Sequence, residues 1–208
     1  MITFALPKGR LMGPILRALG PYAPSAAALD TRALVIPGQD GTVRFLLLKP
    51  PDVPAYVERG VAQLGVVGLD LLREHPADVL EPLPLSLGRC RLCLCSRPGV
   101  DLLARVRQGR LRIGTRYPHL AAAELGRRGL IADIIALNGS VELAVVANLA
   151  DAIVDLVETG ETLRANGLVI REELMDVSAR VVVNRAAFAL DEARLTPLLR
   201  TLEETCGA

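Results

Sequence analysis

Short apolar runs alternate along this chain with longer segments in which apolar residues recur every three to four positions. The short runs fit buried strands and the longer segments fit amphipathic helices, because one face repeats at alternate positions on a strand and about every 3.6 on a helix. Alternation of this kind predicts an α/β fold built from βα units. The predicted strands are Ile2–Leu6, Leu34–Ile36, Val43–Leu48, Gly65–Gly68, Arg91–Ser96, Leu111–Thr115, Ile131–Ala136, Asp151–Val157 and Ser178–Asn184.

Helix boundaries carry their own signals. Asp52 before Val-Pro indicates a helix capped by an aspartate, and Ser140 in Asn-Gly-Ser is a second candidate cap. The remaining predicted helices are Leu11–Leu19, a turn through Leu71 and Leu72, Leu102–Val106, an Ala-rich segment from Pro118 to Gly129, and Asp191–Thr205. The proline-rich stretch Glu81–Leu87 is the best candidate boundary near mid-chain, so we expect two compact lobes.

Composition narrows the class of partner. The formal net charge is +1 and aromatic residues make up 3 %, with no tryptophan, which argues against a nucleic-acid-binding surface. No apolar run approaches the ~20 residues that span a bilayer, and the N-terminus lacks the features of a signal peptide. Four cysteines without secretory context suggest reduced thiols and a cytoplasmic location. Cys90, Cys93 and Cys95 are expected to be structural, because cysteine is among the most buried residue types.

The segment Asp151–Thr162 carries the most specific chemistry. An apolar strand with two acids runs into Glu-Thr-Gly-Glu-Thr and then into a predicted helix. Backbone N–H groups and threonine hydroxyls in such a loop can hold a phosphate, and Gly160 allows close approach or a positive φ. Asp151 and Asp155 share a strand face and could bind a sugar diol or a magnesium ion. Phosphate and diol together indicate a ribose phosphate.

Other strand ends carry weaker signals. Lys8, Gly9 and Arg10 follow the first strand, where α/β sheets bind ligands, although a solvated basic turn is the more common explanation for a lone Lys-Gly-Arg. Ser140 could bind phosphate or act only as a cap. Tyr117 could pack against a purine ring or be structural. The dinucleotide, P-loop and serine-hydrolase fingerprints are absent, and two histidines argue against a histidine-based metal site.

Taken together, these motifs resemble those of ATP phosphoribosyltransferase, the first enzyme of histidine biosynthesis. The resemblance runs from Ile2 to about Asn184. The segments that carry it, in order, are Ala5–Arg10, Asp52–Glu58, Gly65–Asp70, Leu137–Leu143, Asp151–Leu163 and Met175–Arg180.

The resemblance implies a fold of two α/β lobes like the type II periplasmic-binding proteins, with the active site in the cleft between them. It places residues 1–87 and 178–208 in the first lobe and 88–177 in the second. The implied reaction is attack by N1 of the adenine of ATP on C1 of phosphoribosyl pyrophosphate, with release of pyrophosphate. Such a reaction depends on positioning and electrostatic stabilisation rather than on a protein nucleophile.

The resemblance also assigns residues. Arg10 and Arg32 would neutralise the leaving pyrophosphate or ATP phosphates, and would be catalytic. The expected ATP-binding residues are Lys8, Gly9, Lys49, Asp70, Tyr117, Ser140 and Glu142. The expected phosphoribosyl pyrophosphate-binding residues are Asp151, Asp155, Glu158, Thr159, Gly160, Glu161 and Thr162. Mg²⁺ would arrive with the substrate, where Asp151 or Asp155 could contact it, and no protein metal cluster is expected.

Two positions depart from the family pattern. Lys49 stands where the family commonly has arginine, so charge is kept but bidentate geometry is lost. Leu69 stands where lysine is often found. The chain ends at Ala208 without the long form's regulatory domain, which implies the short form, working in a hetero-oligomer with a regulatory subunit that resembles histidyl-tRNA synthetase.

Two other functions remain open at this stage. A non-catalytic solute-binding module could share the two-lobed fold, although the acid-rich phosphate loop and the missing signal peptide count against it. A phosphoribosyltransferase acting on a free base would share the strand and Thr-Gly loop, but not the Lys-Gly-Arg and Asn-Gly-Ser-Val-Glu segments.

Overall fold

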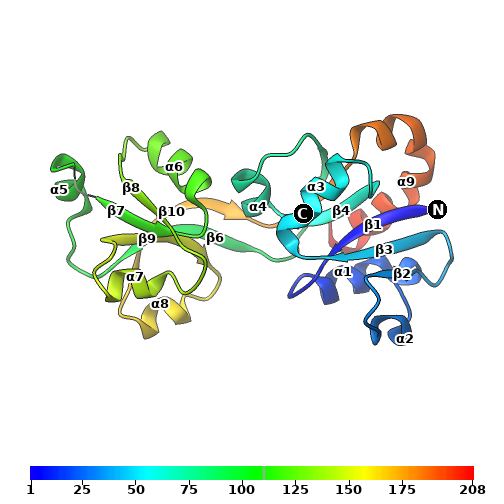
Figure 1. The fold of residues 1–208 in the computed structure, drawn as a ribbon, viewed down its shortest axis with the longest axis horizontal. Coiled ribbons are helices and arrows are strands. Elements are labelled where there is room, and N and C mark those ends of the chain that lie inside the picture. The colour runs from blue at the N-terminus through cyan, green and yellow to red at the C-terminus, as the bar shows by residue number, and fades with distance from the viewer. Residues whose placement is uncertain (110) are drawn as a thin grey trace. The chain divides into compact units, whose positions relative to one another are not determined.

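A computed structural model describes residues 1–109 and 111–208 and divides into two compact units (Figure 1). Unit 1 consists of Met1–Gly88 and Ser178–Ala208, and unit 2 consists of Arg89–Val177. Each unit has its own mixed sheet with helices packed on it. The predicted α/β class is confirmed. The chain leaves unit 1 after Gly88 and returns at Ser178, so the last strand and helix belong to unit 1.

Unit 1 is built on a six-stranded sheet in the order β2-β3-β1-β4-β11-β5. Its strands are β1 (Ile2–Pro7), β2 (Val35–Pro37), β3 (Val43–Leu48), β4 (Leu64–Gly68), β5 (Leu80–Pro84) and β11 (Ala179–Val183). β1 runs parallel to β3 and β4, so the carboxyl ends of these strands lie at one edge. β2 and β3 form the antiparallel hairpin that the sequence predicted.

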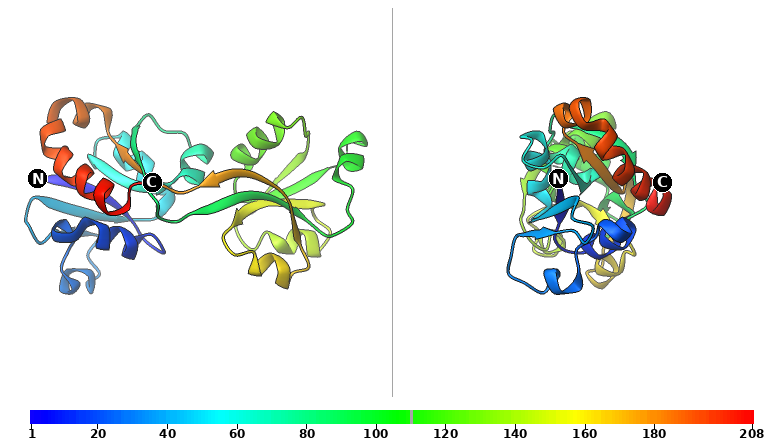
Figure 2. Two further views of the ribbon diagram at one scale, coloured as in Figure 1. Left: turned by 180° about the vertical axis from the view of Figure 1, so that it is seen from behind. Right: turned by 90° about the vertical axis from the view of Figure 1, so that its right-hand side faces the viewer.

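The strand β1 divides the core of unit 1 between two faces. Phe4 and Leu6 pack on the face covered by α1 (Met12–Leu19) and α9 (Arg185–Cys206). Ala5 faces the other way, into a cluster with α3 (Val53–Glu58). The hydroxyl of Thr205 donates to the carbonyl of Ala18 at 3.1 Å, which fixes α9 against α1 (Figure 2). The remaining helices of this unit are η1 (Gly20–Tyr22), α2 (Ala26–Leu29), η2 (Pro50–Asp52) and α4 (Leu69–Glu74).

Unit 2 is built on a five-stranded sheet in the order β10-β6-β9-β7-β8. Its strands are β6 (Cys90–Ser96), β7 (Arg112–Thr115), β8 (Asp133–Ala136), β9 (Ala152–Val157) and β10 (Val169–Val177). β7 runs parallel to β8 and β9, while β6 is antiparallel to β9 and to β10 (Figure 2). Its helices are α5 (Leu102–Arg107), α6 (Pro118–Arg127), α7 (Glu142–Val146) and α8 (Glu161–Ala165).

One face of the unit 2 sheet is covered by α7 and α8. Ile153 and Val157 of β9 pack there with Cys93 and Cys95 of β6, as expected for structural cysteines on one strand face. All four cysteines are buried and none forms a disulfide bond. Burial raises the pKa of Cys93 to about 11 and that of Cys95 to about 12, so both stay protonated at neutral pH. Asp155 is the one acid among the inward-facing residues of β9.

Several local predictions are corrected by the structure. Neither Asp52 nor Ser140 caps a helix through its side chain; α7 starts later than predicted, with Val141 at its N-cap position. α9 begins at Arg185 rather than at Asp191, where the backbone is non-helical and the helix bends. β5 and β10 have no counterpart among the predicted strands. Across residues 1–109 and 111–208, no helix is both long and apolar enough to cross a membrane.

Candidate active site

The loop after β9 contains the glycine of positive φ that the sequence allowed for. Gly160 has φ +75°, a left-handed conformation that glycine adopts without the steric penalty of a Cβ. It precedes α8 directly, so the chain turns sharply from strand to helix. The backbone N–H of Glu161 donates to the hydroxyl of Thr159 at 3.4 Å, and Nη1 of Arg164 donates to the carbonyl of Thr159 at 3.1 Å. Glu158, Thr159, Glu161 and Thr162 are exposed.

Asp155 lies on β9 just before this loop and is paired with Arg116. Nη2 of Arg116 donates to Oδ1 of Asp155 at 3.1 Å. The Asp155 side chain is 12 % exposed and that of Arg116 is 45 % exposed, so the guanidinium extends from a buried acid towards solvent. Burial raises the pKa of Asp155 above its ordinary value, and the charge of Arg116 offsets only part of that effect. Asp155 therefore ionises at higher pH than an exposed aspartate.

The loops after β7 and β8 reach the same edge of the unit 2 sheet. The N–H of Leu137 donates to the carbonyl of Thr115 at 2.8 Å, which holds the two loops together. Ser140 is exposed, and Glu142 opens α7 close enough to Asp155 for its charge to raise the pKa of that carboxyl further. The carboxyl edge of unit 2 comprises the residues that follow β7, β8 and β9: 116–117, 137–142 and 158–162. Of the predicted residues, Tyr117, Ser140, Glu142 and Glu158–Thr162 belong to this edge, and Asp155 lies on β9 just before it.

Tyr117, for which the sequence left open a contact with a purine ring or a structural role, is buried. Only 7 % of the residue is exposed within the chain, and its N–H donates to Oγ1 of Thr115 at 3.0 Å. Its ring lies 5.8 Å from the guanidinium carbon of Arg116, a cation–π distance. Tyr117 thus supports Arg116 and offers little accessible ring surface to a purine.

Asp151 lies apart from the Thr-Gly loop. It precedes the first residue of β9, at the opposite end of the strand from the Thr-Gly loop. Its carboxylate accepts hydrogen bonds from the backbone N–H of Arg112 at 3.0 Å and from Nε and Nη2 of the same residue at 3.2 and 3.1 Å. Although burial opposes ionisation, these bonds lower the pKa of Asp151 below its ordinary value. The full length of β9 therefore separates this acid from the Thr-Gly loop.

Unit 1 gathers basic residues at the carboxyl edge of its sheet, after β1 and β3. The N–H of Lys8 donates to the carbonyl of Leu48 at 2.8 Å, which brings Lys8 beside Lys49. Gly9 has φ +98°, and its carbonyl accepts from Met12 at the start of α1. Lys8, Gly9, Arg10 and Lys49 are all exposed. The Lys-Gly-Arg turn therefore lies at the carboxyl edge of the sheet, where α/β sheets commonly bind ligands.

Arg32 and Asp70 complete this edge. The N–H of Leu47 donates to the carbonyl of Leu34 at 2.8 Å, so the exposed segment holding Arg32 runs alongside the carboxyl end of β3. Asp70 opens α4 and is only 7 % exposed. Its carboxylate folds back over Gly68, where a Cβ would lie 2.1 Å from Oδ1, so any larger residue at Gly68 would displace it.

The described residues contain no group of three or more His, Cys, Asp or Glu side chains that could hold a metal ion. Asp151 and Asp155, the two candidate magnesium ligands, each bind an arginine instead. Arg116 is the residue that the predicted site set lacked. In the sequence, Arg116 could have been recognised as a basic residue that stands between the end of a strand and the proline that starts the next helix.

Comparison with known proteins identifies the family. The model of the family "HisG: ATP phosphoribosyltransferase" matches residues 49–204. An ATP phosphoribosyltransferase from Anaeromyxobacter sp. (strain Fw109-5) is 46 % identical over 211 residues, covering 100 % of this chain and 94 % of the relative. The enzyme from Thermus thermophilus is 42 % identical over 207 residues, covering 100 % of this chain and 98 % of the relative.

Among solved structures, the ATP phosphoribosyl transferase (HisG:HisZ) complex from Thermotoga maritima contains a similar chain. The TM-score is 0.84 at 31 % sequence identity, and the match covers 99 % of this chain and 98 % of that one. The two-lobed fold implied by the resemblance is thereby confirmed. The chain belongs to the ATP phosphoribosyltransferase family, the glycosyltransferases that carry out the first step of histidine biosynthesis.

Proposed function

We propose that the carboxyl edge of unit 2 binds phosphoribosyl pyrophosphate, with the 5′-phosphate held by residues Glu158–Thr162. The left-handed Gly160 carries this proposal, because it turns the chain sharply from β9 into α8, and backbone N–H groups at such a turn can bind a phosphate together with the threonine hydroxyls. The flanking acids Glu158 and Glu161 are exposed and can turn away into solvent. A phosphate here would meet backbone N–H groups and threonine hydroxyls, with the guanidinium of Arg164 beside the loop.

The ribose would lie over Asp155 and Arg116. An ionised Asp155 can accept hydrogen bonds from the 2′- and 3′-hydroxyls, while Arg116 stays charged and keeps the acid oriented. Positive charge develops on the ribose as the bond to pyrophosphate breaks, and a nearby carboxylate favours that charge. Asp155 is therefore both a binding group and an electrostatic stabiliser. Asp151 has no such role in this proposal.

The basic edge of unit 1 would bind the other anions. Arg10 and Arg32 are suited to the departing pyrophosphate, because guanidinium groups can hold two phosphate oxygens at once. Lys8, Gly9 and Lys49 would contact ATP phosphates, and Asp70, Ser140 and Glu142 can accept hydrogen bonds from the nucleotide.

N1 of adenine would then attack C1 of the ribose on the face opposite the leaving group, which inverts that carbon. No proton has to leave N1 before attack, so no strong base is needed.

We further propose that Mg²⁺ enters with phosphoribosyl pyrophosphate rather than as a resident ion. The donor set supports this, since the described residues provide no cluster of carboxylates and Mg²⁺ is commonly held by substrate phosphates and water with one or two acids. The ion would neutralise pyrophosphate charge as it departs. The four buried cysteines, which form no disulfide bond, are consistent with a reducing, cytoplasmic setting.

A regulatory partner is the last part of the proposal. The Thermotoga maritima neighbour was solved as a HisG:HisZ complex, and this chain covers 98 % of the matched chain. We infer that this protein is likewise a short-form catalytic subunit that assembles with a subunit resembling histidyl-tRNA synthetase.

The test is to combine the purified chain with ATP, phosphoribosyl pyrophosphate and Mg²⁺, with and without a HisZ-type subunit, and to measure phosphoribosyl-ATP. We expect product in both mixtures and a higher rate with the partner. An equal rate in both mixtures, with no complex by light scattering, would reject the partner proposal. Binding of phosphoribosyl pyrophosphate unaffected by changes in Glu158–Thr162 would reject the site assignment.

A further inference from the structure

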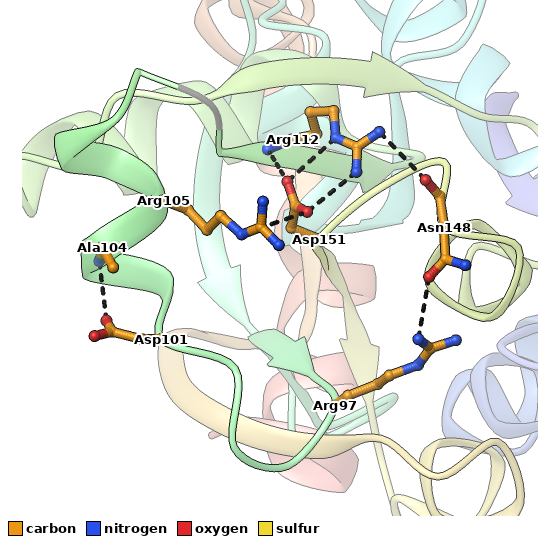
Figure 3. Close-up of polar contacts among 7 residues, drawn as sticks. All are labelled: Arg97, Asp101, Ala104, Arg105, Arg112, Asn148 and Asp151. Atoms are coloured by element: carbon orange, nitrogen blue, oxygen red, sulfur yellow. Dashed lines mark hydrogen bonds and ion pairs between the residues drawn. The ribbon is translucent and has the colours of Figure 1, made fainter.

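A basic cavity lies on unit 2, at the end of β7 and β9 opposite the Thr-Gly loop. Its volume is about 310 Å³, and its lining includes Arg97, Arg105, Arg112, Asn148 and Asp151 (Figure 3). β9 has six residues, so the cavity and the loop are separated by about 20 Å of strand. None of the predicted substrate-binding residues except Asp151 lines it.

The three arginines reach the cavity from different elements. Arg97 follows β6, Arg105 lies on α5 and Arg112 opens β7. Figure 3 shows Arg105 and Arg112 extended towards Asp151, with Arg97 approaching from the far side of Asn148. Convergence of guanidinium groups from separate parts of the fold is unfavourable for the empty protein, because like charges repel in a concave site.

Asp151 accepts hydrogen bonds from only one of these arginines. Arg112 donates three hydrogen bonds to the Asp151 carboxylate, counting its backbone N–H. Nε of Arg105 lies 4.0 Å from Oδ1 of the same acid, which is beyond hydrogen-bond distance. Arg97 donates to neutral oxygens only, namely Oδ1 of Asn148 at 3.1 Å and the carbonyl of Val146 at 3.0 Å. Among the residues that line the cavity, three arginines thus face one carboxylate, while the charge of Asp133 acts on Arg112 from outside the lining.

The cavity is also held in shape. Asn148 has φ +59°, and among the described residues it is the only non-glycine with a positive φ. Nη1 of Arg112 donates to its carbonyl at 3.2 Å while Arg97 binds its side chain, so two guanidinium groups are fixed by one residue. Fixed donors bind an anion with less loss of side-chain entropy than mobile ones. Val100, Val145 and Ala150 add an apolar wall.

We propose that this cavity binds a small phosphate ester, separately from the substrates of the transferase reaction. A phosphate ester carries about −1.5 to −2 charges at neutral pH, which matches the unneutralised charge of Arg97 and Arg105. Arginine presents paired N–H donors to phosphate oxygens. A lone phosphate would leave most of the 310 Å³ unfilled, whereas the organic part of an ester can cover the apolar wall.

The experiment is an NMR titration of the full labelled chain with two probes, inorganic phosphate and glycerol 3-phosphate. We expect the amide signal of Asn148 and the methyl signals of Val100 and Val145 to shift, with glycerol 3-phosphate binding about tenfold more tightly. No shift of these signals up to about 10 mM of either probe would overturn the site. Equal affinities would overturn the assignment of an ester.

Matched variants separate the cavity from general charge effects. The double variant Arg97→Gln and Arg105→Gln should weaken glycerol 3-phosphate at least tenfold, whereas Arg107→Gln, an exposed arginine on the same helix that does not line the cavity, should not. Equal weakening in both variants would overturn the proposal. Wild-type formation of phosphoribosyl-ATP by each variant shows that the fold is intact, since none of these residues is assigned to the reaction.

Discussion

Nη2 of Arg116 lies 3.1 Å from Oδ1 of Asp155, yet burial still raises the pKa of that acid. The ion pair therefore compensates only part of the desolvation of Asp155. Such an acid is maintained at the expense of stability, a pattern that is common at functional sites. Removing the charge of Asp155 should therefore lower activity without lowering stability.

Asp155→Asn should lower the rate at limiting phosphoribosyl pyrophosphate by about 10- to 100-fold, from the loss of roughly 1.5–3 kcal/mol of charged hydrogen bonding. Its melting temperature at pH 7 should equal or exceed that of the wild type, because a buried charge is removed while the side-chain volume is kept. Steady-state kinetics and calorimetry measure the two effects. Asp176→Asn, an exposed acid on β10, serves as the control and should change neither.

The ion pair of Arg116 and Asp155 also predicts how the reaction rate falls at acidic pH. The folded pKa of Asp155 is above its ordinary value, so between the two values the folded state binds the proton more strongly than the unfolded state. As pH falls through the folded pKa, the rate at limiting phosphoribosyl pyrophosphate should decline while this group's contribution to stability improves. Asp155→Asn should lack this decline. An identical acid limb in both proteins would show that another group controls it.

Asp151 should contribute to stability rather than to substrate binding, and its contribution should be lost at low pH. Its pKa is lowered by Arg112, so its contribution to stability is present above the ordinary value and is lost as pH falls through the folded value. Asp151→Asn should lower the melting temperature at pH 7 by about 2–6 °C, corresponding to roughly 1–2 kcal/mol. The affinity for phosphoribosyl pyrophosphate, measured by calorimetry, should stay within about twofold of wild type. A tenfold loss of that affinity would return Asp151 to the substrate site.

The sequence predicts the central strands of the two sheets better than it predicts their margins. β10 is an edge strand whose first five residues are exposed and which contains two register shifts, so no apolar alternation marks it. β5 contains Pro82 and Pro84, which normally argue against a strand, but an edge strand tolerates the missing N–H donors. Both segments are strands because they pair with a neighbouring strand, β10 with β6 and β5 with β11.

For the candidate site, too, the sequence predicts some features and not others. That Lys8, Lys49 and Gly160 follow strands is visible in the apolar pattern, and their positions at sheet edges follow from parallel pairing. The roles of Asp151 and Asp155 were not separable, because both share a strand face at period two. Their partners, Arg112 and Arg116, are each 39 residues away in sequence, and only the pairing of β7 with β9 brings them together.

Gly160→Val tests the phosphate loop against a matched glycine. Gly160 and Gly167 flank α8 and both have positive φ, +75° and +69°, so a valine at either is strained by roughly 1–2 kcal/mol. Gly160→Val should weaken phosphoribosyl pyrophosphate binding at least 100-fold in calorimetry, whereas Gly167→Val should bind as wild type does. Similar affinities in the two variants would mean that the loop backbone does not hold the phosphate.

Arg10→Ala tests the catalytic assignment in unit 1. If Arg10 neutralises the departing pyrophosphate, its interaction strengthens only as the bond breaks, so the variant should lose turnover rather than substrate affinity. We expect kcat to fall by about 10²- to 10³-fold, as for the loss of other charge-stabilising donors, with KM for both substrates within about threefold of wild type. Arg17→Ala, an exposed arginine in the last turn of α1, is the charge-matched control and should retain full turnover. A raised KM for ATP at unchanged kcat would instead assign Arg10 to ground-state binding of the nucleotide.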